Sequence, residues 1–123
     1  MEKNVEISLL LSFYGKMLTD RQSDTIDLYY NEDLSLSEVG AELGISRQGV
    51  RDNLKRAEAI LYDTEERLGL LHRFLGIKNK LLEIDRIIAD IENSPESKLL
   101  SVDMKKQINK ILTIVSEIND EEK

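Results

Sequence analysis

The apolar residues of this chain recur at helical spacing along most of its length, and polar residues mark where helices begin and end. Thr19 and Gln22, and again Ser35 and Glu38, stand three positions apart, the spacing of a capping box. The pattern predicts four helices in the first part of the chain, over residues 5–14, 19–30, 35–43 and 46–68. We therefore expect an all-α fold.

Two longer amphipathic stripes follow. At 100° per residue, the apolar positions of each stripe fall within an arc of about 120°. The stripes consist of Ile77, Leu81, Ile84, Ile87, Ile88 and Ile91, and then of Leu100, Met104, Ile108, Ile111, Leu112, Val115 and Ile118. A polar turn at residues 93–96 separates them, and Gly69 and Gly76 are predicted to interrupt the chain before them. We expect a head over residues 1–68, a helical hairpin over residues 69–123, and five or six helices in total.

Residues 35–61 have the features of a helix-turn-helix. The corner between the two helices needs a small residue, which Gly44 supplies, and Ser46 caps the second helix where it would enter a major groove. Close approach of the helices also needs a small residue, either Gly40 or Ala41. Val39, Leu43, Ile45, Val50 and Leu54 are predicted to fill the space between them.

The second helix of this motif carries its polar residues on one face. With Arg47 set at 0°, Arg51, Lys55 and Gln48 lie at about 40°, 80° and 100°, and the apolar residues lie at about 280–340°. These side chain types pair with guanine, adenine or phosphate, so Arg47, Gln48, Arg51 and Lys55 are the candidate nucleic-acid-binding residues. Asp52, at about 140°, would repel phosphate. The alternative is an ordinary exposed polar helix face.

Composition narrows the remaining chemistry. The 123 residues carry a net charge of −7 and include one histidine and no cysteine. Disulfides and cysteine-based metal sites are excluded, and His72 has no neighbouring ligand pattern. No nucleophile–base pair or nucleotide-binding loop is evident, so we expect no enzyme activity, cofactor, metal site or small-molecule substrate. No apolar run approaches the length of a membrane helix, which predicts a cytoplasmic protein without membrane insertion.

A leucine zipper is a weaker interpretation of the second half. Leucines recur every seven residues at 54, 61, 68, 75 and 82. The other seam position of the heptad is not consistently apolar, and two glycines weaken a continuous helix. Ordinary packing therefore explains these leucines better.

The motif resembles the helix-turn-helix in the promoter-reading C-terminal domain of bacterial sigma factors. Over roughly residues 1–95 the chain is more similar to the YlxM-like family of short bacterial proteins. The residues that carry this resemblance are Leu9-Leu-Leu-Ser-Phe-Tyr-Gly15, Leu18-Thr-Asp-Arg-Gln22, Leu28-Tyr-Tyr30 and Ser46-Arg-Gln-Gly-Val-Arg-Asp52. The resemblance implies a sigma-like DNA-binding regulator. It also implies a link to the signal recognition particle, beside whose genes the family's genes lie.

Two functions therefore compete. The motif favours a regulator that binds duplex DNA. The acidic net charge and the family's gene neighbourhood favour an adaptor that binds protein or ribonucleoprotein components of the secretion-targeting pathway. The two stripes of the hairpin could face each other, cover the head, or join two chains in a four-helix bundle. We expect a homodimer, held by apolar positions that include Ile84, Ile88, Ile91, Ile108 and Val115.

Overall fold

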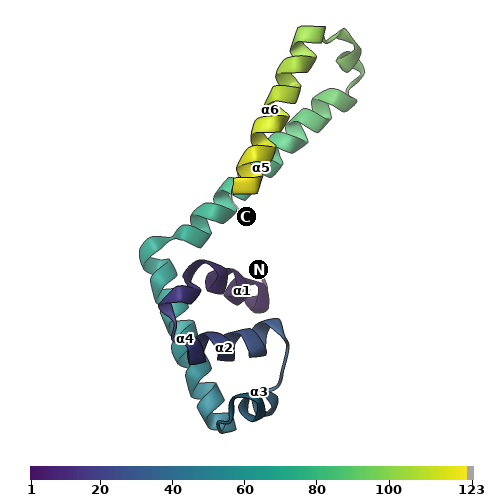
Figure 1. Ribbon diagram of the computed structural model, residues 1–123. Helices are drawn as coiled ribbons and strands as arrows, with labels where there is room; N and C mark the ends of the chain where they lie inside the picture. Colours follow the sequence, from purple (N-terminus) through teal and green to yellow (C-terminus); the bar gives the residue numbers. More distant parts are fainter. Residues whose placement is uncertain (122–123) are drawn as a thin grey trace. The chain divides into compact units, whose positions relative to one another are not determined.

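The computed structural model describes residues 1–121 of the chain. Those residues form six α-helices and shorter helical turns without any strand, which confirms the all-α fold class. The helices are α1 (Lys3–Tyr14), α2 (Asp20–Ile26), α3 (Leu36–Leu43), α4 (Arg47–Leu68), α5 (Leu70–Asn93) and α6 (Val102–Glu121). The chain divides into two compact units, residues 1–72 and the residues from Arg73 onward (Figure 1). The division falls in the first turn of α5, four residues after the predicted boundary.

In the first unit, α1, α2 and α3 pack against the long helix α4 (Figure 1). The face of α4 that they cover repeats every three to four residues, as the sequence predicts for one side of a helix, and consists of Val50, Leu54, Ala57 and Leu61. Ile7 of α1, Ile26 of α2 and Val39 of α3 are fully buried in the same core. The head is therefore a small helical core in which α4 is the common partner.

The connections follow the local capping chemistry. The predicted break after Tyr14 is a 3₁₀ turn, Gly15–Met17. Thr19 and Gln22 form the expected capping box at the start of α2, with both hydrogen bonds present. The predicted second helix continues beyond α2 as a π-helical turn, Asp27–Asn31.

The junction between α4 and α5 is held by a network that the sequence did not predict. Gly69 ends α4 with a positive φ of 65°, as its predicted role requires. The Tyr14 hydroxyl donates to the Glu65 carboxylate at 2.6 Å and accepts from the backbone N–H of Leu70. The same carboxylate accepts from the N–H groups of Leu71 and His72, both at 3.0 Å. Tyr14 and Glu65 thus satisfy the first three N–H groups of α5.

This network shifts the ionisation of both side chains. Burial alone would raise the pKa of Glu65, but the hydrogen bonds from Tyr14, Leu71 and His72 outweigh it and lower that pKa. Burial and the hydrogen bond to Glu65 raise the pKa of Tyr14. The pair is therefore most stable with Glu65 charged and Tyr14 neutral.

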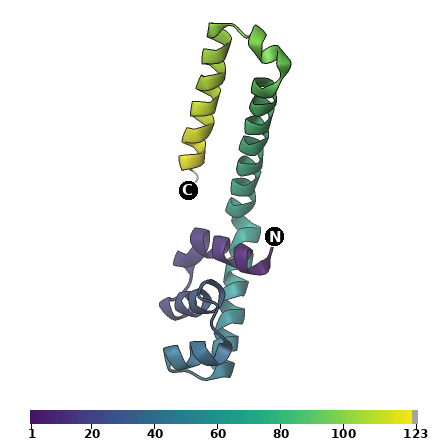
Figure 2. The same cartoon turned by 90° about the vertical axis from the view of Figure 1, so that its right-hand side faces the viewer.

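The second unit contains most of α5, a 3₁₀ turn (Pro95–Leu99) and α6. The two helices run antiparallel and form a hairpin (Figure 2). The predicted interruption at Gly76 is wrong, because α5 passes through it as regular helix. One mid-helix glycine costs only about 1 kcal/mol, which the packing of the surrounding helix offsets. Leu81, Ile88 and Val115 are buried between the helices. The Lys78 ammonium group donates to the backbone and side-chain oxygens of Asn119 at 3.1 Å, across the hairpin.

Two kinds of feature are absent from residues 1–121. None of the helices in this part of the chain is long and apolar enough to cross a membrane. No three histidine or acidic side chains there come together as metal ligands.

Candidate nucleic-acid interface

The corner between α3 and α4 requires glycine at two positions. Gly44 has a φ of 70°, in the left-handed region, and follows the last residue of α3. The N–H of Ile45 donates back to the carbonyl of Gly40 at 3.0 Å, which closes the turn. A Cβ on Gly40 would lie 2.7 Å from the Ile45 carbonyl oxygen. Of the two candidates for the small contact residue, Gly40 is therefore the one that the packing requires, whereas Ala41 is exposed.

Caps fix the start of each helix of the motif. The Ser35 hydroxyl accepts from the N–H of Glu38 at 3.1 Å, and the Glu38 carboxylate accepts from the N–H of Ser35 at 3.0 Å. These hydrogen bonds lower the pKa of Glu38. The Ser46 hydroxyl caps α4 by accepting from the N–H of Gly49 at 3.0 Å. Both predicted caps are confirmed.

A further contact ties the motif to the preceding helix. The Arg21 guanidinium on α2 donates to the carbonyl oxygen of Leu43 at 2.8 Å. This carbonyl belongs to the last residue of α3, where the helix dipole favours a positive charge. Arg21 therefore holds the end of α3 beside α2, a role that no local sequence pattern indicates.

All four candidate residues are exposed within the first nine residues of α4, on the flank beside its buried face. Within residues 1–121, Arg47, Arg51 and Lys55 form no ion pair. The three cations follow one another at intervals of four residues, so they span about 12 Å along the helix. The corner thus presents three uncompensated positive charges on one face.

Gln48 is the exception on this face, because its amide nitrogen donates to the Asp52 carboxylate at 3.1 Å. This contact gives both side chains a partner one helical turn apart, and the spacing of four residues indicates it in the sequence. Gln48 would have to leave Asp52 before its amide could read a base with both donor and acceptor.

The surface beside Arg47 is less positive than the α4 sequence alone predicts. Arg47 lines two adjoining hollows, one shared with Leu36, Gln48 and Arg51, the other with residues that include Asp33 and Glu38. Sequence reasoning missed this acidic rim, because its residues precede α4 by at least nine positions and reach Arg47 only through the fold. The rim limits how far non-specific anions are attracted to the face.

Comparison with known proteins agrees with this geometry. A family described as "Putative helix-turn-helix protein, YlxM / p13 like" matches residues 1–101. The chain belongs to this family. A relative from Acetivibrio thermocellus, named a UPF0122 protein, is 53% identical over 97 residues, which are 79% of this chain and 83% of the relative.

Two other relatives with the same name support the assignment. The protein from Desulforamulus reducens is 42% identical over 93 residues, 76% of this chain and 80% of its own length. The protein from Thermoanaerobacter sp. strain X514 is 43% identical over 108 residues, 85% of this chain and 92% of its own length. The family match includes the whole head, α5 and the turn after it, and ends just before α6.

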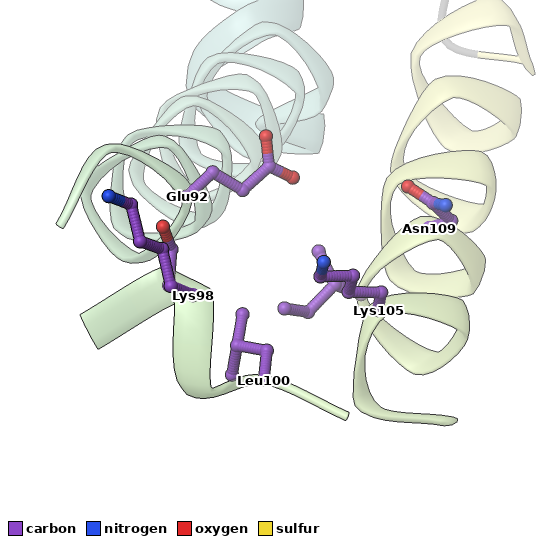
Figure 3. A pocket seen from close by; sticks show the side chains of 7 residues that line it. Glu92, Lys98, Leu100, Lys105 and Asn109 are labelled. Carbon is purple, nitrogen blue, oxygen red and sulfur yellow. The ribbon is translucent and has the colours of Figure 1, made fainter. Parts of the chain in front are cut away.

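A separate hollow lies at the turn of the hairpin. Glu92 of α5 and Lys105 of α6 extend into the space between the two helices, beside Leu100 (Figure 3). Lys98, Ile108 and other residues complete its lining. The lining mixes both signs of charge with apolar groups, so it indicates no single class of ligand.

Proposed function

We propose that this chain is a DNA-binding regulatory protein that inserts the N-terminal turns of α4 into the major groove of duplex DNA. The observation that carries this proposal is the capped corner at Gly44, which holds Arg47, Arg51 and Lys55 exposed and unpaired on one face. A recognition helix of a helix-turn-helix contacts base edges with its first turns in the same way.

Each side chain then has a distinct role. Arg47 and Arg51 lie nearest the start of the helix and can each form two hydrogen bonds to a guanine. Gln48 can pair with adenine once its amide breaks the hydrogen bond to Asp52 and bonds to the base instead. Lys55 lies about 12 Å beyond Arg47 along the helix axis, a distance comparable with the width of the major groove. Its ammonium group therefore contacts phosphate.

The charge balance makes specific binding dominant over non-specific binding. A net charge of −7 opposes approach to DNA, and the acidic rim beside Arg47 adds to this locally. If each chain neutralises three phosphates, log affinity falls with log salt by a slope of about −3 per chain and near −5 to −6 for a dimer. Affinity for random DNA is then weaker than about 10 µM at physiological salt.

The experiment is a binding selection from random duplex DNA with the full chain, followed by titration of variants. Arg47→Ala and Arg51→Ala each weaken the selected site by about 5- to 150-fold, equivalent to roughly 1–3 kcal/mol, and relax its sequence preference. Lys55→Ala weakens all sequences alike. Arg56→Ala is the matched control, because Arg56 is an exposed cation about 140° away from Arg51 on the same helix.

Enrichment of no sequence would contradict the proposal, as would equal effects of Arg47→Ala and Arg56→Ala. We further propose that the protein works in the cytoplasm as a homodimer, because helix-turn-helix proteins commonly read two half-sites.

An adaptor function in the secretion-targeting pathway is the second candidate. The acidic net charge favours it, and so do the exposed apolar side chains of the hairpin, which suit a protein or ribonucleoprotein partner better than DNA. A pull-down of signal recognition particle components with the full chain, in parallel with the DNA selection, separates the two. Capture that persists in the Arg47→Ala and Arg51→Ala variants, without any enriched DNA, favours the adaptor.

A further inference from the structure

The hairpin of α5 and α6 has one face that its own packing leaves apolar and uncovered. Leu81 and Ile88 of α5 and Val115 of α6 are only 4–6% exposed and form the seam between the helices. Five apolar side chains of the two predicted stripes, and Ile114 beside the second stripe, remain 37–54% exposed: Ile84, Ile87, Ile91, Met104, Ile111 and Ile114. The stripes are therefore wider than the contact between the two helices can cover.

These six side chains lie on the same side of the hairpin. At 100° per residue, those of α5 lie on average about 80° around the helix from its seam, and those of α6 lie on average about 50° from Val115 in the same rotational sense. Because the helices run antiparallel, rotations in the same sense from the seam point to the same side of the hairpin. We call these six residues the isoleucine face.

The opposite side of the hairpin carries charged and polar side chains together with apolar ones. Two hollows open there, and their lining residues lie on the other side of the seam from the isoleucine face. One contains Lys78, Asp85 and Ser116, and the other contains Glu92 and Lys105 (Figure 3). The charged side chains of these hollows therefore lie on the other side of the seam from the isoleucine face.

We infer that the isoleucine face binds the same face of a second copy of this chain, so that two hairpins form a four-helix bundle. In such a bundle each helix contacts two neighbours, in directions about 90° apart. On α5 the second apolar direction lies at nearly this angle from the seam, and on α6 it lies on the same side at a smaller angle. The hairpin itself satisfies only the seam direction of each helix. The missing partner is another antiparallel helix pair with the same pattern.

Length also fits a second copy. The part of α5 in this unit and α6 have 21 and 20 residues, so each is about 30 Å long. Side by side they present a face of roughly 30 by 20 Å, comparable with the area of about 800 Å² that a stable interface uses per partner. The six residues of the face carry no charge, and the exposed Lys80 lies in the same arc toward the start of α5.

The inference rests on the proposed homodimer and corrects its contacts. Ile88 and Val115, which the sequence placed at the dimer contact, are buried within the hairpin itself. Ile84 and Ile91 stay on the isoleucine face, and Ile87 and Ile111 join them.

Sedimentation equilibrium of the full chain at micromolar concentration tests this inference. Wild type has the mass of two chains. Ile87→Glu and Ile111→Glu each raise the dimer dissociation constant by at least about 100-fold, because the symmetry buries two unpaired carboxylates. Leu82→Glu is the matched control: Leu82 is 60% exposed on the same helix, but it lies outside the face, and this variant stays dimeric. Circular dichroism should show the same helix content in all four proteins.

A monomeric wild type would overturn the inference, whether the face is bare or covered by residues 1–72. Dimers that persist in both Ile87→Glu and Ile111→Glu would overturn the assignment of the face while leaving the homodimer in place. Affinity for a duplex with a single half-site, measured on the same proteins, reports separately on the proposed function, since no substituted residue lies on α4.

Discussion

The Tyr14–Glu65 network is expected to be among the largest single contributors to the stability of the first unit. Replacing Glu65 with alanine removes three hydrogen bonds to a charged group, two of which satisfy the start of α5. Water can replace part of the two lost hydrogen bonds from the backbone, so the loss of each destabilises the fold by about 1 kcal/mol. Tyr14 is only 3% exposed, and its hydroxyl, which still accepts from Leu70, loses the acceptor of its own proton, at a further cost of about 1 kcal/mol or more.

The expected loss for Glu65→Ala is therefore about 3 kcal/mol, a factor of about 150 in the unfolding equilibrium. For a unit of this size the melting temperature falls by roughly 12–24 °C. Tyr14→Phe removes one hydrogen bond to Glu65 and one from Leu70, and costs about 1–2 kcal/mol. Because both variants delete the same contact, their effects overlap by about 1 kcal/mol in the double variant.

Tyrosine signals make this measurement specific. The chain has four tyrosines and no tryptophan, and all four tyrosines lie within residues 1–72. Near-ultraviolet circular dichroism during urea unfolding therefore follows the first unit. Glu66→Ala is the control, because Glu66 is the adjacent exposed acid and makes no hydrogen bond within the described chain. Equal stability of the Glu65→Ala and Glu66→Ala variants, or strict additivity of the double variant, would refute the reasoning.

The same network sets a pH dependence. The pKa of Glu65 is lower in the folded chain than in the unfolded one, so its stabilisation is complete at neutral pH. It is lost as pH falls below the unfolded value of about 4.3 and through the lower folded value. Urea titrations at several acidic pH values should show a steeper loss of stability in wild type than in Glu65→Ala.

Two further predictions concern the head. Gly40→Ala places a Cβ against the Ile45 carbonyl and should cost about 1–3 kcal/mol in urea unfolding, whereas Ala41→Ser at the exposed neighbour should stay within about 0.5 kcal/mol. Burial and the hydrogen bond to Glu6 raise the pKa of Tyr62 to about 12, so the contact stabilises the fold below pH 10 and is lost as pH rises from 10 to 12. Tyr62→Phe should remove that part of the alkaline destabilisation, and an unchanged alkaline profile would contradict it.

The parts of the structure that the sequence predicted correctly depend on neighbouring residues. A capping box needs only Ser35 and Glu38, and the end of a helix needs only a glycine such as Gly69 that tolerates a positive φ. The stripe on α4 is equally local, because helical periodicity alone places its residues on one side. Local patterns of this kind are sufficient to predict the helix-turn-helix and its exposed face, because neither depends on contacts between distant residues.

The features that the sequence missed depend on residues far apart in the chain. Tyr14 and Glu65 are separated by 51 positions, and neither residue type at its position indicates the other. The acidic rim near Arg47 has the same origin. The hairpin stripes show a different limit: periodicity places Ile87 and Ile88 in the same arc, but only packing decides that Ile88 is buried and Ile87 exposed. The isoleucine face therefore appears only when both helices are in place.

The acidic charge and the second copy of the chain combine into a last prediction. A single head with about three phosphate contacts and a net charge of −7 binds one half-site weakly. Joining two heads makes the second contact intramolecular, at an effective concentration that raises affinity by about 10²- to 10⁴-fold without any new contact. Ile87→Glu should therefore weaken binding to a selected site with two half-sites by that factor, yet leave binding to a single half-site unchanged. Fluorescence anisotropy on the two duplexes, with Leu82→Glu as control, measures both. Equal losses on both duplexes would mean that the substitution disturbs the head, and unchanged binding to the double site would mean that each head reads DNA alone.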